Sequence, residues 1–253
     1  MVLSMERWVG KVAIVTGASE GIGAAIVDQL VEYGLIVVGM ARRVGLMEQC
    51  AEELGDKKGK LHPYKVDLTK EEEVLEAFKW VEDNVGPVHI LVNNAGVCKS
   101  TSLYDGNIDD WRYVINLNLL AVCIGSKEAI RVMRENQING HIINVNSIYG
   151  HRVPSYPGIN MYSPTKHALT CYTEYLRREF NSIGCRIKLT SLSPGFVTTE
   201  MTVLNPNDTI RELLKTFPML KSEDVADAAI FALSTPEDVD VHELTIKPIG
   251  EME

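Results

Sequence analysis

Residues 12–23 read VAIVTGASEGIG, where a short apolar run passes directly into a glycine-rich turn. The run Val12–Thr16 is typical of a buried parallel strand, and an amphipathic stretch from about Ile22 to Tyr33 indicates the helix that follows. Glycines let the backbone of such a turn approach a pyrophosphate, which the helix N-terminus would then bind. The segment therefore predicts a dinucleotide-binding unit, although its GxxxGxG spacing differs from the GxGxxG of the larger dehydrogenases.

Strand and helix patterns alternate along the remainder of the chain. Six further strands are predicted, at Leu35–Ala41, Leu61–Val66, His89–Val92, His141–Val145, Arg186–Leu192 and Leu244–Ile249. Helical patterns lie between them: Glu48–Leu54, a helix opened by a Thr69–Glu72 capping box, a long helix from about Trp111 to Asn136, one from Tyr162 and one capped by Ser222. This alternation predicts an α/β fold, a single Rossmann-type doubly wound parallel sheet of about seven strands with helices on both faces.

One domain is expected to use all of residues 1–253. Residues 6–150 would form mainly the dinucleotide-binding half. Residues 151–253 would hold a catalytic helix, a substrate lid at about 198–218 and the C-terminal strand. The lid is expected because a long irregular stretch inside a regular pattern is more typical of a functional loop than of a linker.

Composition narrows the function classes. Hydrophobic residues make up 45% and charged residues 23% of the chain, as in ordinary soluble domains. A net charge of −9 and the lack of a basic patch argue against nucleic-acid binding. The five cysteines and six histidines have neither disulfide nor metal-ligand spacing, and no run approaches the roughly 20 apolar residues of a membrane-spanning helix. We expect a cytoplasmic protein with reduced thiols, no metal and no transmembrane segment.

The end of the second predicted strand indicates the cofactor. In dinucleotide folds a residue at this position recognises the adenosine ribose: an acid suits the 2′-hydroxyl of NAD, and an arginine accommodates the 2′-phosphate of NADP. Here the strand ends in Ala41-Arg42-Arg43, with no acid. A guanidinium matches phosphate geometry, so the pattern favours NADP(H). The alternative is that both arginines are merely solvated in a loop.

A tyrosine and a lysine in Tyr162-Ser163-Pro164-Thr165-Lys166 have helical spacing. Residues four apart lie one turn above each other on the same helix face. A tyrosine hydroxyl, with a pKa of about 10, is a weak base at neutral pH, and an adjacent ammonium would favour its ionised form. Pro164 lacks an N–H, so this helix should only just have begun. The pair therefore predicts an acid/base site at a helix N-terminus.

Polar residues follow two other predicted strands. Ser147 comes after the fifth strand, and Asn93-Asn94-Ala95-Gly96 comes after the fourth. The carboxyl ends of parallel strands line one crevice in an open α/β sheet. These residues are therefore expected to meet Tyr162 and the glycine-rich turn.

Taken together, these motifs resemble the short-chain dehydrogenase/reductase family in its short form, along essentially the whole chain. The motifs that carry the resemblance are TGASEGIG (16–23), Asp67-Leu68, NNAG (93–96), Asn118, Ser147, YSPTK (162–166) and SPGFVTT (193–199).

The resemblance implies a catalytic tetrad of Asn118, Ser147, Tyr162 and Lys166. Tyr162 would donate a proton to a carbonyl or accept one from an alcohol, and Ser147 would hold the substrate oxygen. Lys166 would bind the nicotinamide ribose and depress the pKa of the tyrosine. Asn118 would hold a water that links Lys166 to solvent, with Asn116 as the competing candidate. The implied NADP(H)-binding residues are Gly17, Ser19, Gly21, Ile22, Gly23, Arg42, Arg43, Asp67, Leu68, Asn94, Gly96, Tyr162, Lys166, Val197 and Thr199.

One stretch departs from the family pattern, because the segment between Ser147 and Tyr162 is slightly longer than usual. Asn146 and Tyr149 could therefore share the role of Ser147. His151 and Arg152 in this segment could touch substrate, but solvated loop positions are the simpler interpretation.

Three further stretches, MERW (5–8), VVGMARRV (37–44) and NSIYGHRVP (146–154), resemble the insect farnesol-dehydrogenase-like group and a vertebrate relative that reduces ketosteroids. The implied function is NADP(H)-dependent hydride transfer to or from an apolar alcohol or carbonyl. Farnesol or a related isoprenoid alcohol is the first choice, with 17β- or 3-ketosteroid or general carbonyl reduction as the alternative. A non-catalytic NADPH-binding sensor would be expected to lack the tyrosine or the lysine. The family also implies a homodimer or homotetramer built on the helices that begin near Trp111 and Tyr162.

Overall fold

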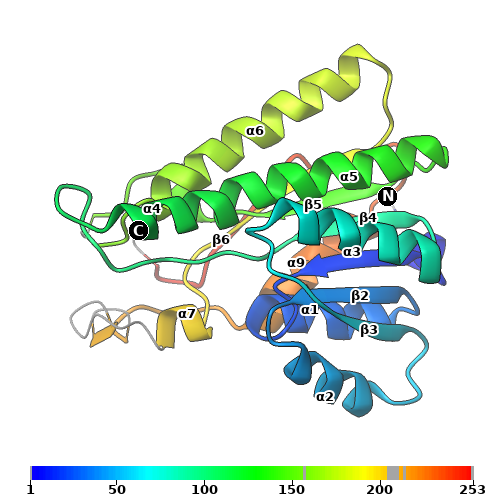
Figure 1. Ribbon diagram of the computed structural model, residues 1–253, viewed down its shortest axis with the longest axis horizontal. Coiled ribbons are helices and arrows are strands. Elements are labelled where there is room, and N and C mark those ends of the chain that lie inside the picture. Colours follow the sequence, from blue (N-terminus) through cyan, green and yellow to red (C-terminus); the bar gives the residue numbers. More distant parts are fainter. Residues whose placement is uncertain (1, 156–157, 204–210, 213–214, 252–253) are drawn as a thin grey trace.

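Seven parallel strands form one sheet in the order β3-β2-β1-β4-β5-β6-β7 in the computed structural model, which describes residues 2–155, 158–203, 211–212 and 215–251 (Figure 1). The strands are β1 Val12–Thr16, β2 Ile36–Ala41, β3 Lys60–Lys65, β4 Val88–Asn93, β5 His141–Val145, β6 Lys188–Pro194 and β7 Glu243–Ile246. The strand order reverses direction beside β1, where a crevice forms at the carboxyl ends of the strands. The predicted doubly wound parallel sheet is confirmed.

Helices cover both faces of the sheet (Figure 1). They are the short turn η1 Glu6–Trp8, then α1 Gly21–Glu32, α2 Val44–Leu54, α3 Glu71–Asn84, α4 Ile108–Ile115, η2 Asn116–Leu120, α5 Ala121–Glu135, the turn η3 Ile148–Gly150, α6 Tyr162–Ser182, α7 Glu200–Val203 and α9 Ser222–Ser234. One hydrophobic core joins α1, α2 and α9 to one face, and a second joins α3, α5 and α6 to the other. Alternate residues of β1 belong to different cores, since Ala13 and Val15 face the first while Val12 and Ile14 face the second.

Several helix starts differ from the predicted ones. The predicted capping box is wrong, because α3 begins at Glu71 and the Thr69 hydroxyl donates a 2.7 Å hydrogen bond to Asp67 Oδ1 instead. The long helix begins at Ile108, three residues earlier than predicted, because Asn107 Oδ1 accepts a 2.8 Å hydrogen bond from Asp109 N–H. Ser222 is the first residue of α9 rather than its N-cap.

The helices α4, η2 and α5 form one continuous helix over residues 108–135, interrupted by the π-helical stretch η2. Its length, and a mean hydropathy of 1.2 over an 18-residue window within it, would suffice to cross a membrane. However, residues of α5 such as Ala129, Val132 and Met133 are completely buried against the sheet. We therefore describe it as a core helix of the α/β fold.

The region predicted as a lid contains α7 at its start. Residues 204–210 and 213–214 lie outside the described residues, and with them Leu204, Leu213 and Leu214 of the predicted lid. Phe217, at the end of the predicted lid, and Met219, just after it, pack against a small hydrophobic cluster beside the crevice.

Candidate active site

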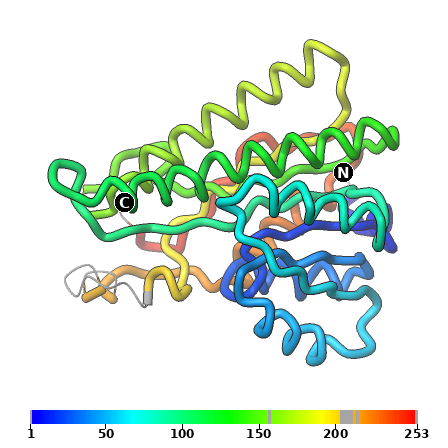
Figure 2. Tube along the Cα trace, in the orientation of Figure 1, coloured from blue at the N-terminus to red at the C-terminus, as the bar shows by residue number. Residues whose placement is uncertain are grey.

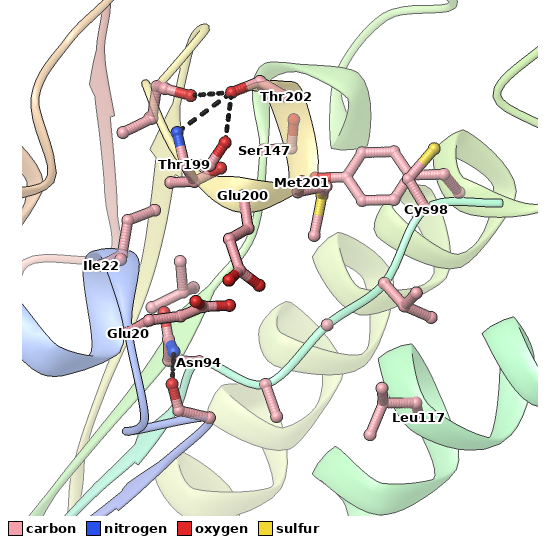
Figure 3. Close-up of a pocket in the computed structure, with 18 of the residues that line it drawn as sticks. Glu20, Ile22, Asn94, Cys98, Leu117, Ser147, Thr199, Glu200, Met201 and Thr202 are labelled. Atoms are coloured by element: carbon pink, nitrogen blue, oxygen red, sulfur yellow. Dashed lines mark hydrogen bonds between the residues drawn. The ribbon is translucent and has the colours of Figure 1, made fainter. Parts of the chain in front are cut away.

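A cavity of about 600 Å³ lies at the carboxyl ends of the central strands (Figure 3). Of the predicted site residues, it is lined by Gly17, Ser19, Gly21, Ile22, Arg42, Arg43, Asp67, Leu68, Asn94, Gly96, Ser147, Tyr162, Lys166, Val197 and Thr199. Gly23 and Asn118 lie behind this lining. The strand topology thus brings the predicted residues to one place, as expected for the switch point of a doubly wound sheet.

The glycine-rich turn is closely packed on β4. A Cβ added to Gly23 would lie 2.2 Å from the Gly17 carbonyl oxygen, so only glycine fits there. Asn94 Nδ2 donates to the carbonyl oxygens of Thr16 (3.0 Å) and Gly17 (3.2 Å). Thr16 Oγ1 in turn accepts from the backbone N–H of Asn94, at 3.0 Å. Asn94 therefore holds the turn in place, and the N-terminus of α1 opens into the cavity.

Two arginines follow β2 in different environments. Arg43 pairs with Glu20 of the glycine-rich turn and, at 2.9 Å, with Glu200 at the start of α7. These hydrogen bonds raise the pKa of Arg43 above its usual range, and the hydrogen bond to Glu20 has the largest effect. The guanidinium of Arg42 instead lies 5.9 Å from the centre of the Tyr113 ring.

Glu20 and Glu200 were not expected from the sequence. Their carboxyl groups lie side by side in the cavity (Figure 3). Burial, together with the hydrogen bond from Glu20 to Glu200, raises the pKa of Glu20, whereas the same hydrogen bond lowers the pKa of Glu200. Glu20 stands inside the TGASEGIG motif, so its place in the glycine-rich turn was visible in the sequence. Nothing local indicated that Glu200, far along the chain, would join it.

Asp67 and Leu68 line the same end of the cavity. Asp67 Oδ1 accepts hydrogen bonds from Thr69 N–H at 3.1 Å and from the Thr69 hydroxyl at 2.7 Å. Burial alone would raise the pKa of Asp67, but these hydrogen bonds and the charges of Arg42 and Lys70 lower it below its usual value. Asp67 is therefore a fixed, ionised acceptor.

Tyr162 is the first residue of α6, and Lys166 lies one turn later. The Lys166 ammonium is 5.7 Å from the centre of the Tyr162 ring and donates a 2.8 Å hydrogen bond to the Val145 carbonyl oxygen at the end of β5. Its burial lowers the pKa of Lys166 to about 8. Pro164 falls in the first turn, as its missing N–H requires.

Asn118 lies in the π-helical stretch η2, and its side chain is buried. Its amide bonds both backbone groups of Val97: Nδ2 donates to the carbonyl oxygen at 2.9 Å, and Oδ1 accepts from the N–H at 2.8 Å. Nδ2 also lies 3.3 Å from Thr165 Oγ1, next to Lys166. Asn116 contributes its carbonyl oxygen to the same turn by accepting from Ala121 N–H. Asn118 therefore connects η2 to α6.

Ser147 follows β5 and its hydroxyl oxygen accepts from Tyr149 N–H at 3.1 Å. Ser147 also lines the cavity, so its hydroxyl group can donate a hydrogen bond there. Asn146 Nδ2 is directed elsewhere, to Thr170 Oγ1 at 2.8 Å. His151 Nε2 lies 3.0 Å from Ser193 Oγ, and neither His151 nor Arg152 lines the cavity.

The remaining wall of the cavity is apolar. Ile148, Tyr149, Ile159 and Phe196 form a buried cluster against which Cys98, Tyr162, Phe217 and Met219 pack. The rings of Phe196 and Phe217 stack at 4.8 Å. Burial raises the pKa of the Cys98 thiol to about 12, so this cysteine is a protonated wall residue rather than a nucleophile. Cys98 and Ile159 were not predicted, because only the fold brings their loops beside α6.

A family model and related proteins of known name all point to the same family. The short chain dehydrogenase family model matches residues 11–209. The chain is 45% identical over 249 residues to a farnesol dehydrogenase of Aedes aegypti, covering 98% of this chain and 99% of that protein. It is 42% identical over 254 residues to dehydrogenase/reductase SDR family member 11 of Bos taurus, covering 98% and 100%.

Solved structures agree with these relatives. The closed form of a serine dehydrogenase complexed with NADP+ is 26% identical, covers 96% of each chain and superposes with a TM-score of 0.86. A short chain dehydrogenase from Burkholderia cenocepacia in complex with NADP is 29% identical, covers 95% of this chain and 98% of its own, and gives a TM-score of 0.83. The fold, the placement of the tyrosine and lysine, and these relatives together show that this chain belongs to the short-chain dehydrogenase/reductase family of oxidoreductases.

Proposed function

We propose that this protein is an NADP(H)-dependent alcohol dehydrogenase/carbonyl reductase acting on apolar alcohols or carbonyls, with farnesol or a related isoprenoid alcohol as the preferred substrate. The observation that carries the proposal is Tyr162 packed in the apolar cluster with Phe196 while Lys166 lies one helical turn away. An acid/base group with a charged neighbour on one side and an apolar wall on the other suits an apolar molecule with one reactive oxygen.

In the proposed reaction the bound nicotinamide would supply or accept the hydride. Tyr162 takes the alcohol proton in oxidation and returns it to the carbonyl in reduction. Ser147 donates a hydrogen bond to the substrate oxygen and keeps its proton, and Lys166 holds the nicotinamide ribose and favours the ionised form of Tyr162. Asn118 fixes η2 against Val97 and Thr165, where it supports a water path from Lys166 to solvent.

NADP(H) is favoured over NAD(H) by the arginines that follow β2. Arg42 and Arg43 line the cavity, and no acidic residue stands at the end of this strand. Two neighbours in structure carry NADP in their own sites. The 2′-phosphate would therefore contact the two guanidinium groups, and Asp67 with Leu68 would contact the adenine.

Reduction of ketosteroids or of carbonyls in general is the second candidate. It is supported by the relative named dehydrogenase/reductase at 42% identity, and by an apolar cavity wall that fits a rigid ring system as well as an isoprenoid chain. A non-catalytic NADPH-binding sensor is disfavoured because both Tyr162 and Lys166 are present. We further propose a cytoplasmic homodimer or homotetramer that associates through the long helix and α6.

The proposal is tested by following absorbance at 340 nm with the purified protein. NADP+ and NAD+ are each combined with farnesol, geraniol, a 17β-hydroxysteroid and a simple secondary alcohol. Farnesol turnover with NADP+ supports the proposal, and steroid turnover alone replaces it with the second candidate. If the protein turns over none of the alcohols, and none of the matching carbonyls with NADPH, the result would contradict an oxidoreductase of apolar alcohols.

A further inference from the structure

Glu251, near the C-terminus, inserts a buried carboxylate beside the candidate active site. Its side chain has 0% exposure. Oε2 accepts a 3.0 Å hydrogen bond from the backbone N–H of Phe196, and the Lys247 ammonium lies 3.2 Å from Oε1. The chain that follows β7, drawn in red, runs toward the end of the molecule that also carries α7 (Figure 2). A segment remote in sequence thus reaches the loop that follows β6.

Gly195 lies directly against the Glu251 carboxylate. A Cβ added to Gly195 would lie 2.1 Å from Glu251 Oε2, and the three nearest atoms it would meet all belong to Glu251. Gly195 N–H also donates a 2.8 Å hydrogen bond to the carbonyl oxygen of Ile246 in β7. A side chain at position 195 would therefore require the Glu251 carboxylate to move.

The loop held by Glu251 forms part of the cavity wall. Phe196, Val197 and Thr199 line the cavity. On its other side the loop is bonded to Leu220, whose N–H donates to the Phe196 carbonyl oxygen at 2.8 Å and whose carbonyl oxygen accepts from Thr198 N–H at 2.9 Å. The backbone N–H of Phe196 is thus bonded to Glu251 and its carbonyl oxygen to Leu220. Without the carboxylate, its N–H would lose a charge-assisted hydrogen bond next to an apolar wall.

We propose that Glu251 is a positioning residue that fixes the Phe196 ring against Phe217 and Tyr149, and thereby selects large apolar substrates over small ones. This inference rests on the proposed function, because it assigns a specificity role within that same site. Phe196 stacks on Phe217 at 4.8 Å and meets the Tyr149 ring edge-on at 6.1 Å. A large substrate spans this wall, whereas a small alcohol needs only Ser147 and Tyr162.

Two substitutions separate the hydrogen bond from the bulk of the side chain. Glu251→Gln keeps an oxygen that can accept from Phe196 N–H, so kcat/KM for farnesol should stay within about twofold. Glu251→Ala removes the acceptor, so kcat/KM for farnesol should fall about tenfold, mainly through KM, while that for a simple secondary alcohol changes less than about twofold. Glu76→Ala, which removes an exposed glutamate on α3, is the matched control.

Hydrogen exchange provides a readout without turnover. The peptide that spans residues 194–199 should exchange faster in Glu251→Ala than in the unaltered protein, and at the unaltered rate in Glu251→Gln. Gly195→Ala should disturb the loop in the unaltered protein, because its Cβ meets the carboxylate. The same substitution should be tolerated in the Glu251→Ala background, where that space is open.

The outcomes separate the inference from the proposed function. Unchanged exchange and an unchanged substrate ratio in Glu251→Ala would overturn the positioning role. Equal losses for both alcohols with a lowered melting temperature would also overturn it, in favour of a general structural role. If the unaltered protein turns over no alcohol or carbonyl, the proposed function fails. The exchange of residues 194–199 then still decides whether Glu251 fixes the loop.

Discussion

The Lys166 ammonium lies 5.7 Å from the centre of the Tyr162 ring, and the residue is buried. Burial disfavours its charged form and lowers the pKa of Lys166 to about 8. The ammonium is close enough to Tyr162 for its charge to favour the ionised form of the tyrosine hydroxyl, so the pH dependence of turnover should depend on both residues.

We expect alcohol oxidation to rise with pH through an apparent pKa below the usual tyrosine value of about 10, and carbonyl reduction to fall through the same transition. The physical reason is that oxidation needs Tyr162 without its proton, so that it can accept one from the alcohol. Reduction needs Tyr162 with its proton, so that it can donate one to the carbonyl oxygen. The measurement is kcat/KM from pH 6 to 10 in both directions. Lys166→Met should slow turnover and move the transition upward, and an unmoved transition in this variant would contradict the pairing.

Tyr162→Phe should lower kcat by at least about a hundredfold, because it removes the group that exchanges a proton with the substrate oxygen. NADPH binding, followed by cofactor fluorescence, should be unchanged within about twofold. Tyr175→Phe is the matched control, because Tyr175 lies on the same helix and is 65% exposed. Substantial activity in Tyr162→Phe would remove this residue from its role.

Arg42→Ala should raise the Kd of NADPH about tenfold or more and that of NADH less than about twofold, because only NADPH carries the 2′-phosphate. Titration of both cofactors measures the two constants. Arg178→Ala, which changes an exposed arginine on α6, serves as control. Equal weakening of both cofactors would show that the phosphate is recognised elsewhere.

Glu200→Gln should tighten NADPH binding severalfold with little change for NADH. Arg43 is paired with Glu200 at 2.9 Å, and weakening this pair leaves the guanidinium available to the 2′-phosphate. Glu212→Gln removes the same charge from a residue that pairs with Lys215 rather than with Arg43. Identical effects of the two variants would point to net charge rather than to the Arg43 pair.

A stability prediction concerns Lys188, whose ammonium donates a 2.6 Å hydrogen bond to Thr235 Oγ1 and whose pKa burial lowers to about 8. The unfolded chain keeps this proton up to its ordinary pKa of about 10.4. Between these values the unfolded state therefore binds more protons, so the contribution of Lys188 to stability rises with pH. Urea unfolding of the unaltered protein and of Lys188→Met at pH 7, 8.5 and 10 should show the difference shifting in favour of the unaltered protein. A difference independent of pH would contradict the lowered pKa, and Lys79→Met, at an exposed lysine, controls for surface charge.

Local patterns in the sequence predicted much of the fold and of the site. The strands Val12–Thr16 and His141–Val145, and the start of a helix at Tyr162, were predicted at their observed residues. Such features depend on hydrophobic runs and on neighbours within one turn, which are visible along the chain. Even between neighbouring residues, the sequence did not show which of two possible hydrogen bonds would form. Thr69 hydrogen-bonds to Asp67 instead of capping α3.

Contacts between distant segments were decided by the tertiary structure alone. Arg43 forms an ion pair with Glu200, and Phe196 N–H donates a hydrogen bond to Glu251. Both contacts form because the strands are parallel, so the carboxyl ends of β2, β6 and β7 lie on the same side of the sheet. No periodicity links residues so far apart, and their pairing depends on the order of the strands and on the path of the loops between them. The sequence by itself determined a doubly wound α/β fold with Tyr162 and Lys166 on one helix face. The tertiary structure decided that Glu20 and Glu200 pair with Arg43 and that Glu251 holds the loop of the apolar wall. These contacts depend on close approach in space between segments that are distant in the sequence.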